Sequence, residues 1–387
     1  MTRWLAVTVV TVLALVAAPA YAETGVTDTA IVVGCSNSFS GPLAFTGTEL
    51  TKFGIDLYFK HINDQGGIHG RKVRTVYYDD GYRPQAAVAN TKKLVERDRV
   101  FAILQPQGTP PVVATLAYLT ENKVPLLFPY QGASVTRGKQ YVFSGMTLYD
   151  RQAQIMIDYL VSKRNFKKFA VLYQDDAYGK SFLVPFEKNL ARHNLKLVAA
   201  ESYKRGTKDV SAQIAKLQAA KPEVTFLVAT PGPAAQALKE ANKIGWKDTL
   251  MVSSGPLTDE RYLALAGVAS EGVEGLSLWP DPLASDLPGV RQYRQVLEKY
   301  HPGHEPNRYS LSGYFAAMLF TEGAKRAGKN LTRDGLIRAL EGINHWESGI
   351  LPALTISPAD HETQQQGFWV RVEGGRFKSL TGWMSAQ

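Results

Sequence analysis

The chain of 387 residues contains a single cysteine, Cys35. One cysteine excludes a disulfide within the chain and the paired Cys-x-x-Cys patterns of zinc and redox sites. The seven histidines are dispersed. His301 and His304 are separated by Pro302 and Gly303, so they do not share a helical face as two metal ligands would. We therefore predict no metal site and no cofactor.

Catalytic motifs are also absent. The sequence has no HExxH, GxSxG or GxxxxGK[ST] pattern. Asp79-Asp80 and Asp175-Asp176 precede turn residues, where aspartate commonly caps helices or forms Asx turns. Cys35 directly follows an apolar run and is typical of a packed residue rather than a nucleophile. Residues suited to ligand binding are plentiful, whereas residues suited to catalysis are few. The chain is therefore predicted not to be an enzyme.

Clustered charge is missing as well. The chain has 44 Lys and Arg against 35 Asp and Glu, a formal net charge of +9, but no run of five or more basic residues. A nucleic-acid partner would favour a basic stripe. We interpret the scattered excess as a solvated surface with a mild attraction for anionic ligands, and we expect no nucleic-acid partner.

One long apolar run is present, at residues 5–18. Arg3 precedes it, Pro19 ends it, and Ala20-Tyr21-Ala22 follows with the small-x-small pattern that signal peptidase cleaves. The run is shorter than the roughly 20 residues of a membrane span. Residues 1–22 are therefore predicted to be a signal peptide, with export of a soluble protein to the periplasm. An uncleaved N-terminal anchor is the alternative.

The remaining chain alternates between short apolar strands and helices. The predicted strands are 31–35, 73–78, 100–104, 124–128, 169–173, 195–200, 224–229 and 250–253. The predicted helices are 48–63, 85–97, 112–122, 152–163, 181–193, 210–219 and 233–244. This alternation indicates an α/β fold with parallel sheets covered on both faces. The length favours two such units.

The last third departs from this alternation. Residues 290–300, 310–326 and 333–341 have helical patterns, and a predicted strand at 368–372 leads to a turn at Gly374-Gly375. A helical block this late in the chain suggests that the chain returns to cover the first unit.

Ligands of open α/β sheets lie beyond the carboxyl ends of the strands. The loops at those ends are 36–46, 105–111 and 129–133 in the first unit, and 174–179, 230–233 and 254–257 in the second. They are rich in Gly, Ser, Thr, Gln and Tyr, which present hydroxyls and backbone N–H groups suited to a carboxylate. The same residue types also occur in ordinary turns, so the composition alone leaves both interpretations open.

Three passages resemble a known family. They are SGPLAFTG at Ser40–Gly47, the stretch Ile62–Asn90, and LYQDDAYGKS at Leu172–Ser181. These passages are similar to the type I periplasmic binding proteins of the leucine/isoleucine/valine-binding group. The resemblance implies two Rossmann-like, doubly wound lobes in a Venus-flytrap arrangement, whose cleft closes on the ligand.

The resemblance also implies lobe boundaries. Three hinge crossings would lie near Gly145–Leu148, Leu276–Pro280 and Gly349–Pro352. The N-terminal lobe would comprise 27–146 plus 279–350, and the C-terminal lobe 147–278 plus 351–387.

Ligand-binding positions follow from the same resemblance. The loop that grips the ligand carboxylate corresponds to Gln107, Gly108 and Thr109, with Thr109 as the hydroxyl donor. The next loop corresponds to Tyr130, Gln131 and Gly132, where Gly132 replaces the family's hydroxyl. The aromatic pocket positions correspond to Phe45 or Thr46, Tyr178 and Tyr309.

Two positions depart from the leucine-binding pattern. Ser254 stands where leucine-type members have an acid that holds the ligand's ammonium group, and the region of Thr230 lacks the family's tyrosine. A buried ammonium without a partner costs several kcal/mol. We therefore expect a small carboxylate, carbonyl or aromatic acid in preference to leucine, isoleucine or valine, unless Asp176 or Glu260 supplies the missing charge.

The resemblance implies a monomeric subunit of an ABC importer that presents its ligand to membrane permease subunits. A sensory module that feeds a chemoreceptor or sensor kinase is one alternative, because the same fold serves both roles. A periplasmic amide or ester hydrolase is a second, although the sequence offers no nucleophile–base pair for it.

Overall fold

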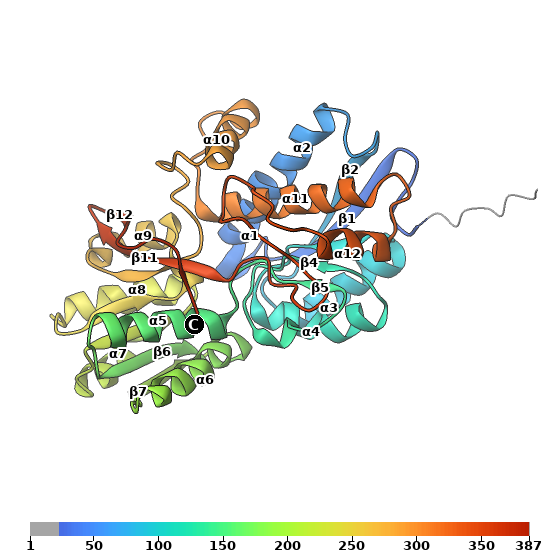
Figure 1. The fold of residues 1–387 in the computed structure, drawn as a ribbon. Helices are drawn as coiled ribbons and strands as arrows, with labels where there is room; N and C mark the ends of the chain where they lie inside the picture. Colours follow the sequence, from blue (N-terminus) through green and yellow to red (C-terminus); the bar gives the residue numbers. More distant parts are fainter. Residues whose placement is uncertain (1–22, 387) are drawn as a thin grey trace, which may run out of the picture.

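The computed structural model describes residues 23–386, so the predicted signal peptide at 1–22 lies outside the described residues. Two lobes, each built on its own sheet, lie side by side (Figure 1). This confirms the predicted two-lobed α/β fold. Among the described residues, no helix is long and apolar enough to span a membrane.

The first sheet is entirely parallel, in the order β2-β1-β3-β4-β5. Its strands are β1 (Ala30–Asn37), β2 (Lys72–Asp79), β3 (Ala102–Leu104), β4 (Leu126–Leu127) and β5 (Val142–Phe143). Strand β1 lies between β2 and β3 and is almost wholly buried, which explains its continuous apolar sequence.

Helices cover both faces of this sheet. They are η1 (Gly41–Leu43), α1 (Ala44–Leu50), η2 (Thr51–Ile55), α2 (Asp56–Asp64), α3 (Pro84–Lys92), η3 (Lys93–Arg97), α4 (Thr109–Glu121) and η4 (Ser134–Thr136). Helix α4 starts three residues before the predicted 112, because prolines at 110 and 111 are tolerated in a first helical turn.

The second sheet has the order β12-β11-β10-β9-β8-β6-β7, and β13 also pairs with β11. Its strands are β6 (Phe169–Gln174), β7 (Leu197–Tyr203), β8 (Val224–Val228), β9 (Leu250–Ser253), β10 (Glu274–Ser277), β11 (Gln366–Glu373), β12 (Arg376–Ser379) and β13 (Met384–Ser385). Strands β6–β10 are parallel, whereas β11–β13 are antiparallel. The predicted turn at Gly374-Gly375 joins β11 to β12, and both glycines have positive φ.

The helices around this sheet are α5 (Tyr149–Asp158), η5 (Tyr159–Lys163), α6 (Ala177–Arg192), α7 (Ser211–Ala219), α8 (Pro231–Lys243), η6 (Gly255–Leu257), α9 (Glu260–Ala266) and η7 (Gly267–Ser270). Each of the helices predicted in this region is present, with ends shifted by a few residues.

The late helical block packs on the first lobe. It comprises α10 (Pro288–Tyr300), α11 (Arg308–Ala327) and α12 (Arg333–Glu341). Helix α11 lies beside α2 in Figure 1 and contacts α1, η2 and α2. A Cβ on Gly54 would lie 2.6 Å from the Cα of Gly313, so the two backbones touch. Only glycine allows this close approach.

The chain passes between the lobes three times. The first passage joins β5 to α5 and the second joins β10 to α10. The third comes later than the expected Gly349–Pro352. Ile356 N–H still donates to Ile343 O (2.9 Å), and Thr363 N–H still donates to Ser144 Oγ (3.0 Å). The side chain of Glu362 already contacts Arg151 of the second lobe, and the remaining contacts change lobes between Thr363 and Gln366, where β11 begins. Residues 351–363 form no regular element, so no periodicity marked their attachment to the first lobe.

Candidate ligand-binding site

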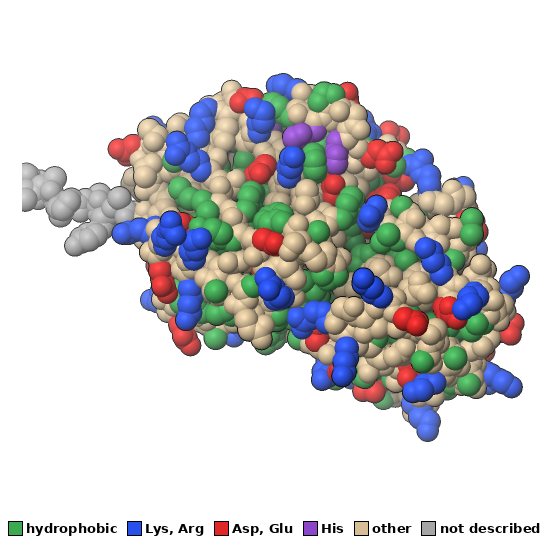
Figure 2. Space-filling model, turned by 180° about the vertical axis from the view of Figure 1, so that it is seen from behind, with side chains coloured by type: hydrophobic (Ala, Val, Ile, Leu, Met, Phe, Trp, Pro, Cys, Tyr) green, Lys and Arg blue, Asp and Glu red, His purple; other side chains and the backbone are tan. Residues whose placement is uncertain are grey.

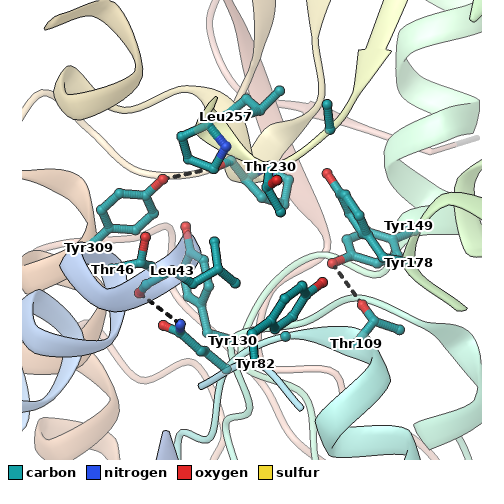
Figure 3. Close-up of a pocket in the computed structure, with 15 residues that line it drawn as sticks. Leu43, Thr46, Tyr82, Thr109, Tyr130, Tyr149, Tyr178, Thr230, Leu257 and Tyr309 are labelled. Carbon is teal, nitrogen blue, oxygen red and sulfur yellow. Dashed lines mark hydrogen bonds between the residues drawn. The ribbon is translucent and has the colours of Figure 1, made fainter. Parts of the chain in front are cut away.

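A cavity lies between the lobes, beyond the carboxyl ends of strands from both sheets (Figure 3), and the empty space of about 440 Å³ around it includes volume open to solvent. The first lobe contributes Leu43, Thr46, Tyr82, Gln107, Gly108, Thr109, Tyr130 and Tyr309, and the second Tyr149, Tyr178, Ala229, Thr230, Pro231, Pro256 and Leu257. Five of these residues are tyrosines and three are threonines, and none carries a charged side chain.

Eight of the twelve predicted positions line this cavity: Thr46, Gln107, Gly108, Thr109, Tyr130, Tyr178, Thr230 and Tyr309. The other four, Phe45, Gln131, Gly132 and Ser254, lie behind or beside its wall. Of the eight, Gln107 donates from Nε2 to Leu43 O (3.1 Å), while its buried Oε1 has no hydrogen-bond partner.

Two of the four remaining positions are occupied by local contacts. Phe45 is 38% exposed and lies edge-on to Tyr309, with Arg261 over its ring. Gln131 bonds within its own loop: its N–H donates to Pro129 O (2.8 Å), and its Oε1 accepts from Ala133 N–H (2.6 Å), while its buried Nε2 has no hydrogen-bond partner in the described part of the chain. The backbone near Gln131 therefore offers few of the donors that the sequence led us to expect.

The other two support tyrosines. Ser254 is buried, and its Oγ lies 3.0 Å from the Tyr178 hydroxyl. The Gly132 carbonyl accepts from Tyr149 N–H (2.6 Å). A Cβ on Gly132 would lie 2.5 Å from the Tyr149 ring, so a side chain there would displace Tyr149.

Tyr82 and Tyr149 are the aromatic lining residues that the sequence analysis missed. Both rings occupy space that a glycine leaves free, since a Cβ on Gly108 would lie 2.5 Å from the Tyr82 ring. Tyr82 lies within the resembling passage 62–90 but has positive φ and follows a turn, whereas Tyr149 begins α5 directly after the first crossing. The glycines in the two loops were the available signal, because they implied that a neighbouring group comes close.

The helices that begin at the cavity have few free backbone donors. Helix α4 has prolines at 110 and 111, α8 has them at 231 and 233, and η6 has one at 256. Val112 N–H and Ala234 N–H already donate to the cap carbonyls of Gly108 and Thr230. In the first turn of α4 only Thr109 N–H remains, which weakens the anion site that a helix N-terminus normally provides.

Several contacts join the lobes across the cavity. Gln174 Nε2 donates to the Tyr82 hydroxyl (3.2 Å), and Arg205 donates to Tyr82 O (3.2 Å). The Tyr149 hydroxyl lies 3.3 Å from Thr109 Oγ1, and Tyr309 donates to Pro256 O (3.2 Å) (Figure 3). The lobes are thus closed on the cavity.

The acids that might have replaced the missing charge at Ser254 are each paired with an arginine. Asp176 caps α6 by accepting from Tyr178 N–H (2.9 Å), and it pairs with Arg205 (3.1 Å). Glu260 forms an ion pair with the buried Arg308 through Oε1, while its buried Oε2 has no hydrogen-bond partner among the described residues. Neither acid lines the cavity. Asp259, the neighbour of Glu260 in the sequence, is buried. Its burial, together with the charge of Glu260, raises the pKa of Asp259 well above its usual value.

The lining tyrosines are neutral. Burial raises the pKa of Tyr82, Tyr130, Tyr178 and Tyr309 well above the usual value, and it raises the pKa of Tyr149 to about 12. At neutral pH every one of these hydroxyls keeps its proton and is a hydrogen-bond donor. The cavity therefore offers neutral donors on aromatic walls.

Residues 30–376 match the family described as periplasmic binding protein. The chain belongs to this family. The match spans both sheets of this periplasmic binding protein, apart from the terminal strands, and it includes every cavity-lining residue.

Individual relatives agree with this assignment. An amino acid binding protein from Pseudomonas aeruginosa is 26% identical over 78% of this chain and 79% of its own length. The structure of a possible leucine/isoleucine/valine-binding protein from Rhodopirellula baltica superposes with a TM-score of 0.86 at 23% identity, covering 91% of this chain and 96% of that one. A fatty acid ABC transporter substrate-binding protein from Thermomonospora curvata has a TM-score of 0.84 at 25% identity, with 95% of each chain covered. The ligands named for these proteins differ, so the family does not fix the ligand.

Proposed function

We propose that this protein is the substrate-binding component of an ABC importer and that its ligand is a small carboxylate without an ammonium group. The observation that carries the proposal is the cavity between the lobes, which has aromatic walls, hydroxyl donors and no charged lining residue. A cavity enclosed by two lobes suits capture of a small molecule by closure.

The chemistry of the cavity favours a carboxylate over an amino acid. A carboxylate accepts hydrogen bonds, and neutral hydroxyls satisfy it well because charge-assisted bonds are strong. An ammonium group needs acceptors, preferably charged ones, and Ser254, Asp176 and Glu260 supply none at the cavity wall. The relative from Thermomonospora curvata, which is named for fatty acids, is a precedent for a carboxylate ligand without an amino group.

The proposed setting is the periplasm, where the closed protein would present its ligand to permease subunits as a monomer. In Figure 2 the basic and acidic side chains are interspersed over the face shown, without a continuous basic stripe, and we propose no nucleic-acid partner. A sensory role would use the same closed form and a different membrane partner. Hydrolysis is disfavoured because the cavity wall includes no acid, histidine or cysteine that would serve as a base or nucleophile.

Calorimetry with leucine, its des-amino analogue isocaproate, and benzoate tests the proposal. Both carboxylates should bind at least about tenfold more tightly than leucine, because an unmet charged hydrogen bond costs roughly 1.5–3 kcal/mol. Each ligand should be recovered unchanged after incubation. Tighter binding of leucine than of both carboxylates would overturn the proposed ligand class, and a chemically altered ligand would overturn the transport role.

A further inference from the structure

We propose that Tyr82 is the gate of the cavity and that Arg205 and Gln174 of the second lobe hold this gate closed. The inference rests on the proposed function, the capture of a small molecule between the lobes, and it identifies the side of the cavity at which the ligand enters and leaves. Tyr82 lines the cavity (Figure 3) and was not among the binding positions predicted from the sequence.

The strand order places the gate far from the three crossings. In the first sheet, β5 leads into the first crossing, and β2, which Tyr82 follows, is the opposite edge strand. In the second sheet, the other two crossings join β10 and β11, and Arg205 follows β7 at the far edge. Four strand spacings separate β2 from β5 and also β7 from β10, which is about 19 Å in each sheet. A rotation of the lobes about the crossings would therefore open the cleft most widely at the gate.

Tyr82 is held from the second lobe by three contacts. Arg205 Nη1 donates to the Tyr82 carbonyl (3.2 Å), and the guanidinium group lies over the Tyr82 ring, 5.2 Å from its centroid. Gln174 Nε2 donates to the Tyr82 hydroxyl (3.2 Å). Tyr82 is only 2% exposed in this closed arrangement. Because its partners belong to the other lobe, opening would break these contacts and expose the ring.

The first lobe holds Tyr82 where the second lobe can reach it. Its φ of 62° is in the left-handed region, which is rare for a residue with a bulky side chain. The Tyr82 N–H donates to Asp80 Oδ1 (2.8 Å), and the carboxyl group of Asp80 also accepts from Ser36 and Ser38. The ring lies against Gly108, where a Cβ would be 2.5 Å from it. A strained residue held this firmly is typical of ligand clamps and switch regions.

The charge at the gate stays paired when the cleft opens. Arg205 Nε donates to Asp176 Oδ2 (3.1 Å), and both residues belong to the second lobe. Gln174 Nε2 donates to the same carboxylate oxygen (2.6 Å). Opening would therefore remove the bonds to Tyr82 without leaving a buried charge unpaired, which is the costly outcome for an arginine. The gate is thus built to break and re-form.

This arrangement has a kinetic consequence. The contacts to Tyr82 form only after the lobes close, so they should slow ligand dissociation and have little effect on association. Arg205 and Gln174 do not line the cavity. Removing their contacts should therefore speed the dissociation of every ligand by the same factor, whereas the loss of a direct ligand contact would affect different ligands to different degrees.

Stopped-flow kinetics with benzoate, isocaproate and leucine test the gate in Arg205→Met, Arg205→Lys and the control Arg192→Met. Arg205→Met keeps most of the aliphatic stem but no hydrogen bond, so each ligand that binds should dissociate about tenfold faster, with little change in association. Arg205→Lys should have a smaller effect, because an ammonium group keeps the charge but lacks the planar fork that reaches both Asp176 and Tyr82. Arg192 bonds to Asn189 and Asp158 within the second lobe, and Arg192→Met should change neither rate.

Two further measurements sharpen the test. Tyr82→Phe and Gln174→Met both remove the bond between these side chains, so their combined effect on dissociation should be smaller than the product of the two single effects. Small-angle scattering tests the gate without any ligand. The ligand-free Arg205→Met protein should have a larger radius of gyration than Arg192→Met, because the open form loses no contact at this position.

The possible failures of the gate and of the proposed function are distinct. Dissociation rates in Arg205→Met that are unchanged for every ligand that binds, together with an unchanged radius of gyration, would overturn the gate and leave the proposed function intact. Dissociation that accelerates by different factors for different ligands would also overturn it, in favour of a direct ligand contact. Tighter binding of leucine than of both carboxylates would overturn the proposed ligand class alone, since a common acceleration would still support the gate.

Discussion

The cavity and the hinge lie at the same boundary between the lobes, yet they use opposite chemistry. The cavity wall has no charged side chain. At the hinge, the buried carboxylate of Glu362 accepts from Arg137 (2.7 Å) and Arg151 (2.6 Å), and Arg137 also pairs with Asp150 (2.7 Å). This network, Arg137–Asp150–Arg151–Glu362, ties the loop before β5 to the start of α5 and to the third crossing.

The difference follows from what each region does as the lobes move. Groups near the hinge keep their neighbours during a rotation, so buried charges there remain paired and avoid a desolvation penalty. Groups on the cavity wall would lose their cross-lobe neighbours and meet water if the cleft opened as proposed. Neutral hydroxyls and aromatic rings change surroundings at a smaller cost than charges do.

The largest expected effect comes from placing a charge directly behind the cavity wall. Ser254→Glu puts a carboxylate at a buried position with no basic neighbour in the cavity wall. It should lower the free energy of unfolding by about 3 kcal/mol, as measured by urea denaturation. The same-sized Ser254→Gln is the control without charge. Leucine, but not isocaproate, should raise the melting temperature of the Glu variant. Equal stability of the two variants would show that this wall tolerates charge.

The reverse change, removing a charge from the hinge, should have a smaller effect. Glu362→Gln keeps the shape of the side chain but weakens two charge-assisted hydrogen bonds. A loss of about 1–2 kcal/mol in unfolding free energy is expected, because Arg137 and Arg151 are partly exposed and can be solvated. The exposed pair Arg326–Glu322 is the control, and Glu322→Gln should cost no more than about 0.5 kcal/mol. Equal losses in both variants would remove the distinction between hinge and surface.

Replacing the buried acid Asp259 should have the smallest effect of the three substitutions. Unlike the other two, it should stabilise the protein. Burial, followed by the charge of Glu260, raises the pKa of Asp259 above the ordinary 3.8. The stability contributed by its protonated form is fully present below that ordinary value and is lost as the pH rises through the raised one. Asp259→Asn keeps a capping side chain for α9 and should raise the melting temperature at mildly alkaline pH. Thermal denaturation across the acid range should show the gain shrinking towards pH 4, and a gain independent of pH would contradict the assignment.

The sequence predicted the helices and strands of this protein better than it predicted the tertiary contacts between them. Periodicity located nine of the strands because most of these are short, apolar and bounded by turn residues. It missed β5, β10, β12 and β13, which have only two to four residues each and therefore show too little pattern. The loops with Thr109 and Tyr178 were found because strand ends define the ligand edge of such sheets. Tyr309 lies in helix α11 and was assigned only through the family resemblance. Tyr82 and Tyr149 were missed since their positions depend on contacts with Gly108 and Gly132 that no local pattern encodes. The third crossing lies later than expected for a related reason, because residues 351–363 form no helix or strand and attach through tertiary contacts, among them the buried Leu354 and Ile356 and the stacking of His361 on Phe143.

The five prolines at the cavity have an effect beyond the donors they remove. Proline fixes φ near −65°, so the first turns of α4, α8 and η6 have little conformational freedom to lose. Loops that are already ordered reduce the entropy cost of capturing a ligand. Most of the ordering that accompanies capture should therefore be the rigid-body rotation of the lobes, with little contribution from the loops that touch the ligand.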